Sequence, residues 1–257
     1  MIDTHSHLYG KEFDDDREAV MQRAKDAGVK CVFLPNEDET TLSAVLSTCA
    51  ANPGFCYPMI GFHPECVDKD FKKRLLPMRR LLERKNPYIG IGETGMDLYW
   101  DRAYLKEQQE ALEIQVQWAL DFHLPLMVHC RSAYSELLEV FEPYKRQLTG
   151  VFHSFTGTEE EAFKLLDYEG FMLGINGILT FKKSKLPNVL ASTVPLDRLV
   201  LETDSPYLAP VPYRGRRNES SFVKEIAMRL ASVYDVSFDK ISHITTNNAL
   251  KVFNLFV

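Results

Sequence analysis

Six side chains of metal-binding type follow hydrophobic runs that are spread along the whole chain. They are four histidines and two carboxylates: His5, His7, Glu93, His129, His153 and Asp204. His5 and His7 open the chain in Ile-Asp-Thr-His-Ser-His, and alternate residues of an extended strand share a face, so both imidazoles point the same way. One His-x-His pair could arise by chance among seven histidines. The same placement of the other four makes a metal site the better interpretation.

The size of this set indicates how many ions it holds. A catalytic ion that keeps an open position takes about three protein ligands, and six exceed that number. We therefore expect two divalent metal ions with one carboxylate bridging them. Paired ions about 3.5–4 Å apart can activate a shared water and stabilise both the attacking and the leaving oxygen, which is hydrolytic chemistry. Imidazole favours Zn or Mn, whereas the carboxylates also admit Mg, so the identity of the metal stays open.

Four further residues are candidates for binding a substrate. His63, in Gly-Phe-His-Pro, ends its own hydrophobic run, and a loop histidine with its hydrogen bonds satisfied is the alternative. Arg131 lies two positions beyond His129 on the same face, where a guanidinium could bind a phosphate through two hydrogen bonds. A salt bridge at the rim is its alternative role. Arg214 and Arg216 add positive charge to one loop, as a phosphate substrate would need.

The elements that position these residues alternate regularly. Eight short β-branched runs are expected to begin as strands near Ile2, Val29, Phe55, Tyr88, Pro125, Thr149, Gly170 and Leu199. Their starts lie 21 to 37 residues apart, which leaves room for a helix between each pair, with clear helical patterns at 104–122, from about 220, and at 238–253. Eight such repeats in about 250 residues predict an α/β fold, a (β/α)8 TIM barrel, with a doubly wound sheet as the alternative.

The barrel explains why ligands so distant in sequence could meet. The carboxyl ends of barrel strands converge at one mouth, and each of the six ligands lies at the end of its run. We see no linker that would divide the chain, so residues 1–257 are expected to form one domain. The longest irregular segment, 206–218, follows the eighth strand, and loops of that size are often functional.

Bulk properties exclude several classes of protein. Charged residues at 26% and hydrophobic residues at 45% are ordinary for a globular protein. The uncharged stretch 40–64 is broken by proline and glycine, and the N-terminus lacks the pattern of a signal peptide, so we expect no membrane association. Five cysteines without a Cys-x-x-Cys pair suit the reducing cytoplasm. A net charge of −6 disfavours a protein that coats nucleic acid.

The motifs together resemble those of the TatD family of metal-dependent deoxyribonucleases. The matching segments are residues 2–8, 61–64, 92–97, 129–131, 153–155, 202–210 and 213–218, in family order. The resemblance implies a barrel and a divalent-metal hydrolase that cleaves phosphodiester bonds in DNA, often as a 3′-to-5′ exonuclease. Single-stranded DNA ends would be the substrate, and a monomer is favoured.

The resemblance also implies roles for individual residues. One ion would be held by His5, His7, Glu93 and Asp204. The other would be held by Glu93, His129 and His153. Glu93 and Asp204 would be the catalytic residues, with Asp204 orienting or deprotonating the attacking water, while His63 and Arg131 match positions near the substrate.

Two alternatives stay open at this point. The first is another metal-dependent hydrolase on the same barrel, such as an amidohydrolase, a lactonase or an aminoacyl-tRNA deacylase. Two-metal members of that group often use a carbamylated lysine on strand four, where this chain has Glu93. The second is a binding module without catalysis, which an intact ligand set makes the weaker interpretation.

Overall fold

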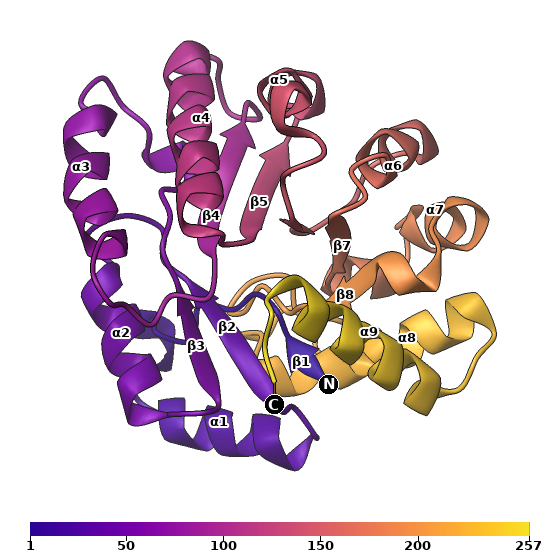
Figure 1. The fold of residues 1–257 in the computed structure, drawn as a ribbon. Helices are drawn as coiled ribbons and strands as arrows, with labels where there is room; N and C mark the ends of the chain where they lie inside the picture. Colours follow the sequence, from indigo (N-terminus) through magenta and orange to yellow (C-terminus); the bar gives the residue numbers. More distant parts are fainter. Residues whose placement is uncertain (257) are drawn as a thin grey trace.

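Eight parallel strands form the centre of the molecule in the computed structural model, which describes residues 1–256 (Figure 1). Their bounds are β1 Ile2–Asp3, β2 Cys31–Pro35, β3 Cys56–Met59, β4 Ile91–Asp97, β5 Leu126–Arg131, β6 Gly150–Phe152, β7 Phe171–Ile175 and β8 Leu199–Leu201. Each begins within three residues of its expected start. The prediction of a (β/α)8 barrel is confirmed.

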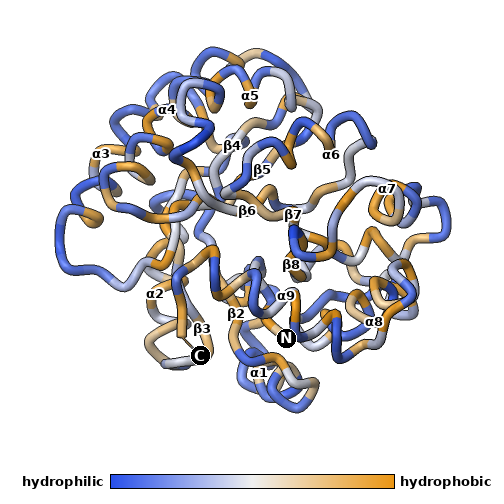
Figure 2. The backbone as a smooth tube through the Cα atoms, turned by 45° about the vertical axis from the view of Figure 1, so that its right-hand side comes forward, coloured by the Kyte–Doolittle hydropathy of each residue, from blue (hydrophilic) through white to orange (hydrophobic). Residues whose placement is uncertain are grey.

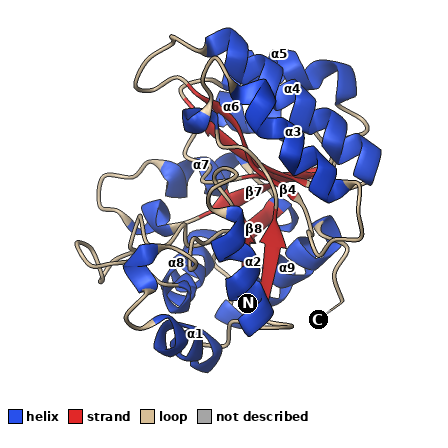
Figure 3. Ribbon diagram, turned by 90° about the vertical axis from the view of Figure 1, so that its left-hand side faces the viewer, coloured by secondary structure: helices blue, strands red, loops and turns tan. Residues whose placement is uncertain are grey.

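Helices surround the strands, as Figure 3 shows from the side. Within residues 1–256 the α-helices are α1 Arg17–Asp26, α2 Leu42–Ala51, α3 Phe71–Leu82, α4 Leu105–Phe122, α5 Tyr134–Phe141, α6 Glu159–Leu166, α7 Leu186–Thr193, α8 Val223–Tyr234 and α9 Phe238–Val252. One helix follows each of β1 to β7, and both α8 and α9 follow β8. No helix in this part of the chain is long and apolar enough to cross a membrane.

The strands form two sheets that meet at two seams. One sheet has the order β1-β2-β3 and the other the order β4-β5-β6-β7-β8, all parallel. Isolated bridges join them, from Ile60 to Ile91 after β3 and from Ser6 to Ser205 after β1 and β8. The ring therefore closes through single bridges and not through continuous ladders at these two places.

The barrel interior is filled by apolar side chains that lead directly to the site. One buried cluster takes members from seven of the eight strands, among them Ile2, Phe33, Met59, Met127, Val151, Met172 and Val200. Successive side chains in a strand alternate between faces, so the interior face passes from Met127 to His129 and from Val151 to His153. Figure 2 shows the same division, with apolar segments towards the centre and hydrophilic ones outside.

The segment between β8 and the next short helix stays irregular, as expected. Tyr213 stacks on Phe222 with ring centroids 3.9 Å apart, which fixes the end of this segment against the helices. The segment runs along the same mouth as the predicted ligands, because it follows Asp204 directly.

Candidate metal centre

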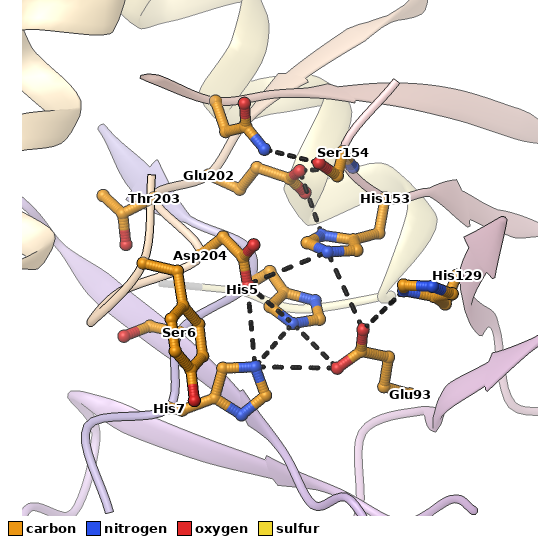
Figure 4. Close-up of polar contacts among 12 residues, drawn as sticks. His5, Ser6, His7, Glu93, His129, His153, Ser154, Glu202, Thr203 and Asp204 are labelled. Atoms are coloured by element: carbon orange, nitrogen blue, oxygen red, sulfur yellow. Dashed lines mark hydrogen bonds and ion pairs between the residues drawn. The ribbon is translucent and has the colours of Figure 1, made fainter. Parts of the chain in front are cut away.

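The six predicted ligands converge at the mouth of the barrel (Figure 4). His5 Nε2 lies 3.2 Å from His7 Nε2 and 3.2 Å from Glu93 Oε2. Asp204 Oδ1 lies 3.7 Å from His5 Nε2 and 3.6 Å from His7 Nε2. His5, His7 and Asp204 thus form one group that could hold a divalent cation, and Glu93 Oε2 borders it.

The two carboxylate oxygens of Glu93 face different imidazole nitrogens. Oε2 faces His5 and lies 3.6 Å from His7 Nε2. Oε1 lies 3.1 Å from His129 Nδ1 and 3.8 Å from His153 Nε2. Glu93 accordingly belongs to two overlapping groups that could hold an ion, one with His5 and His153 and the other with His63 and His129. A carboxylate in this position can bridge two ions.

Two expectations about these positions need correction. Glu93 was expected at the end of its run, but it is the third residue of β4, which continues to Asp97. The pairing with β5 is irregular between Ile91 and Thr94, so Glu93 lies where the regular register of the two strands is interrupted. His5 and His7 were expected on a strand, but β1 ends at residue 3. They converge because the backbone after β1 is still hydrogen-bonded to the segment after β8: His7 N–H donates to the carbonyl of residue 205 at 2.7 Å.

Three partners behind the ligands were not assigned from the sequence. Glu202 is fully buried, and its Oε1 lies 3.0 Å from His153 Nδ1 (Figure 4). Asp97 Oδ2 lies 2.9 Å from His129 Nε2, and the hydroxyl oxygen of Tyr9 lies 2.9 Å from His7 Nδ1. Such partners fix the orientation of a metal-binding imidazole. Glu202 could have been found from its place two residues before Asp204, on the same face.

The carboxylates change the pKa values of the histidines. Burial alone would lower the pKa of His153, but Glu202 and Asp204 raise it to about 10. Burial would likewise lower the pKa of His129, but Asp97 and Glu93 raise it to about 9. Without a metal, His129 and His153 therefore hold positive charge as protons. A cation that binds here must displace them.

The backbone at the end of β8 is held in an uncommon conformation. Asp204 has a φ of 58°, in the left-handed region, and its N–H donates to the His5 carbonyl at 2.9 Å. Non-glycine residues in this region often occur at functional sites. Nearby, the buried Asp3 accepts hydrogen bonds from Thr203 N–H at 2.8 Å and from its hydroxyl at 2.7 Å. These contacts fasten the start of the chain to the last strand.

His63, a predicted substrate residue, lies inside the same cluster. Its Nε2 is 3.4 Å from Glu93 Oε1, and its ring centroid is 4.5 Å from that of His129. Its Nδ1 accepts a hydrogen bond from Glu65 N–H at 3.1 Å. In the neutral ring the proton is then on Nε2, so His63 is arranged here as a hydrogen-bond donor towards the mouth.

A pocket of about 560 Å³ opens over the cluster, and the predicted arginines differ in their relation to it. Arg131 lines the pocket together with His63. Arg214 and Arg216 do not line it: Arg214 stacks 3.7 Å above the ring of Phe181, and Arg216 is exposed on the loop. Contact of these two with a substrate stays a prediction.

Comparison with known proteins identifies the family of this chain. A family model described as TatD related DNase matches residues 2–254. The uncharacterized metal-dependent hydrolase YabD of Bacillus subtilis is 34% identical over 257 residues, which cover 99% of each chain. A protein of Pantoea vagans named 3'-5' ssDNA/RNA exonuclease TatD is 32% identical over 261 residues, covering 99% of this chain and 100% of its own.

A solved structure extends the likeness to three dimensions. YJJV, a TatD homolog from Escherichia coli, matches with a TM-score of 0.92 and 30% identity, over 100% of this chain and 98% of that one. The chain belongs to the TatD-related DNase family and is a metal-dependent hydrolase.

Proposed function

We propose that this protein hydrolyses phosphodiester bonds in DNA with two divalent metal ions, and that it degrades single strands from the 3′ end. The observation that supports this proposal most is that the two carboxylate oxygens of Glu93 face different histidines: Oε2 faces His5, and Oε1 faces His129. One ion would be held by His5, His7, Glu93 and Asp204. The other would be held by Glu93, His129 and His153.

The donor set fits this role. When bound, such a pair of ions lowers the pKa of a water and offsets negative charge on a phosphate. The chain itself supplies the carboxylate of Asp204, which stands at the mouth within 4 Å of three imidazoles and can accept the proton of the attacking water. His63 and Arg131 line the pocket from which a phosphate would approach, and both can donate hydrogen bonds to it.

The substrate is inferred from relatives and from charge. The Pantoea vagans relative carries the name of a 3'-5' ssDNA/RNA exonuclease. Arg131 places positive charge on the rim of the pocket in a chain whose net charge is −6. We retain the cytoplasm as the proposed location, supported by five free thiols.

Replacing Asp204 tests the proposal. We expect Asp204→Asn to reduce hydrolysis of 5′-labelled single-stranded DNA by at least about 100-fold in Mg²⁺, Mn²⁺ or Zn²⁺, because the proton acceptor is lost while the fold is kept. Linear and circular strands are compared, since an exonuclease leaves the circle intact. Circular dichroism of the variant checks the fold.

Two outcomes would contradict the proposal. Full activity of Asp204→Asn would remove Asp204 from the mechanism. Absence of DNA cleavage, together with hydrolysis of an amide, a lactone or an aminoacyl-tRNA ester, would assign the same site to another class of substrate.

A further inference from the structure

Two aromatic side chains stand exposed beside the metal pocket. Tyr99 and Trp100 follow β4, and they are 52% and 74% exposed. Their rings meet edge to face with centroids 4.9 Å apart, and the guanidinium of Arg131 lies 3.6 Å over Tyr99 and 5.6 Å from Trp100. We call these three residues the rim platform. So much exposed aromatic surface needs a reason, because water disfavours it.

The rim platform is tied directly to a candidate metal ligand. One oxygen of Asp97 accepts the backbone N–H of Tyr99 at 2.9 Å, and the other lies 2.9 Å from His129 Nε2. The carbonyl of Arg131 accepts the N–H of Leu98 at 3.0 Å. The carboxylate that orients His129 thus also fixes the start of the platform, so the two cannot move independently without breaking these bonds.

A second cavity lies beside the pocket over the metal site and reaches two residues of the rim platform. It has a volume of about 530 Å³ and is lined by Tyr99 and Arg131, among others. Cys130, Arg131 and Thr156 line both this cavity and the pocket above the ligands. A chain-like molecule that runs from the metal site along these shared residues therefore reaches Arg131 and Tyr99, and Trp100 lies next to them.

We propose that the rim platform binds a nucleobase of the single-stranded substrate, which stacks on Trp100 while Arg131 contacts a neighbouring phosphate. This inference rests on the proposed function and names the feature that selects single strands. Every base offers a flat π face, and aromatic side chains next to a cationic groove are the usual means of holding unpaired bases. In a duplex the bases stack on each other, so they cannot reach Trp100.

Arg131 is available for this contact. Among residues 1–256 it forms no salt bridge with a carboxylate, unlike Arg102, which pairs with Glu136 close by. Its flat face is covered by Tyr99, and the hydrogen-bonding edge of a stacked guanidinium stays free for a phosphate.

Kinetics give the first test. For a single-stranded oligonucleotide we expect Trp100→Ala to raise KM about tenfold, with kcat changed by less than about twofold, because stacking contributes to binding and not to the chemical step. Trp100→Phe should restore most of the affinity. Hydrolysis of a small chromogenic phosphodiester, which has no neighbouring base, should be unchanged. Phe163→Ala, which removes an aromatic ring that is 63% exposed on α6, is the matched control.

Fluorescence gives a second, independent test. The chain has two tryptophans, and Trp118 is only 1% exposed, so Trp100 is the accessible reporter. A phosphorothioate-linked oligothymidylate, which resists cleavage, should quench the emission of the metal-loaded protein. An abasic strand of equal length and charge should not.

The outcomes separate this inference from the proposed function. Cleavage of DNA with an unchanged KM in Trp100→Ala would overturn the rim platform and leave the function standing. Quenching by the oligothymidylate without any cleavage would support the platform and reject the nuclease. Equal quenching by the abasic strand would show that the bases are not what the platform recognises, and would also overturn it.

Discussion

Glu202 is outside the set of candidate ligands, yet it determines how one of them can act. The carboxylate is fully buried, accepts the N–H of Ser154 at 2.6 Å and lies 3.0 Å from His153 Nδ1. A negative charge this close to Nδ1 favours the proton on that nitrogen, which leaves the lone pair on Nε2, the nitrogen that faces Glu93 and Asp204. A neutral amide in the place of Glu202 would leave this tautomer less favoured.

Glu202→Gln tests this role. We expect the affinity for the divalent metal to fall by roughly 10- to 100-fold, with little change in far-ultraviolet circular dichroism, because the ligand itself is retained. Metal content after equilibrium dialysis measures the effect. Glu139→Gln, an exposed carboxylate on α5, is the control and should bind metal as the unmodified chain does. Equal metal affinity in both variants would refute the role.

The chemistry of the ligands could be read from the sequence, but their partners could not. His129 and Asp204 are recognisable because metal-binding types stand at the ends of hydrophobic runs. Asp97 and Tyr9 look like ordinary polar residues until the fold places them against an imidazole. Arg214 differs in the other direction. Its charge suggested substrate binding, but its guanidinium packs on Phe181, and no local sequence pattern predicts that contact.

At the scale of elements, β4 and β5 approach so closely that one position cannot carry a side chain. Gly95 has a φ of 145°, and a Cβ there would lie 1.8 Å from the carbonyl oxygen of His129. The two residues are register partners across the strands. The position of His129 at the mouth thus depends on residue 95 of the neighbouring strand being a glycine, without a Cβ.

Gly95→Ala should therefore damage both stability and the site. We expect a loss of more than about 2 kcal/mol in the free energy of unfolding, measured in urea, with reduced metal binding by His129. Gly28→Ala is the control, because Gly28 also has a positive φ, 83°, but has nothing within 4 Å of the added carbon. Its cost should be about 1 kcal/mol, from the backbone conformation alone. Equal losses in the two variants would mean that the close approach has no effect.

The strands themselves were predictable, and their ends were not. Hydrophobic runs locate all eight strands, since most strand residues are buried on both faces and only β3 and β5 include partly exposed ones. The same runs stop at Gly92, whereas β4 continues through Glu93 to Asp97. Pairing with β5 keeps these polar residues in an extended conformation. Because the two strands are far apart in the sequence, no local pattern predicts that β4 continues this far.

For the molecule as a whole, the charge of the site links metal binding to stability. The folded protein raises the pKa of His129 to about 9 and that of His153 to about 10, both above the ordinary value of 6.5. A raised pKa stabilises the fold fully below pH 6.5, and this contribution is lost as pH rises through 9 and 10. A bound metal replaces the protons and removes the loss.

We accordingly expect the melting temperature of the metal-free protein to decrease, relative to that of the metal-loaded protein, as the pH rises from 6.5 to 9. Differential scanning calorimetry at matched ionic strength measures the gap. The metal-free His153→Asn variant should show a shallower dependence, because one of the groups with a raised pKa is absent. A gap that stays constant over this range would contradict the linkage.

The seam where the barrel closes has a consequence for the time at which the protein becomes active. Ser6 and Ser205, which bridge the first and last strands, are 199 positions apart in the chain, and the ligands His5 and Asp204 flank them. During folding, His5 and His7 can meet Glu93 before this seam closes, but they meet Asp204 only once it has closed. A chain whose seam is still open therefore lacks the Asp204 carboxylate beside these imidazoles, and the complete site appears only with the closed barrel.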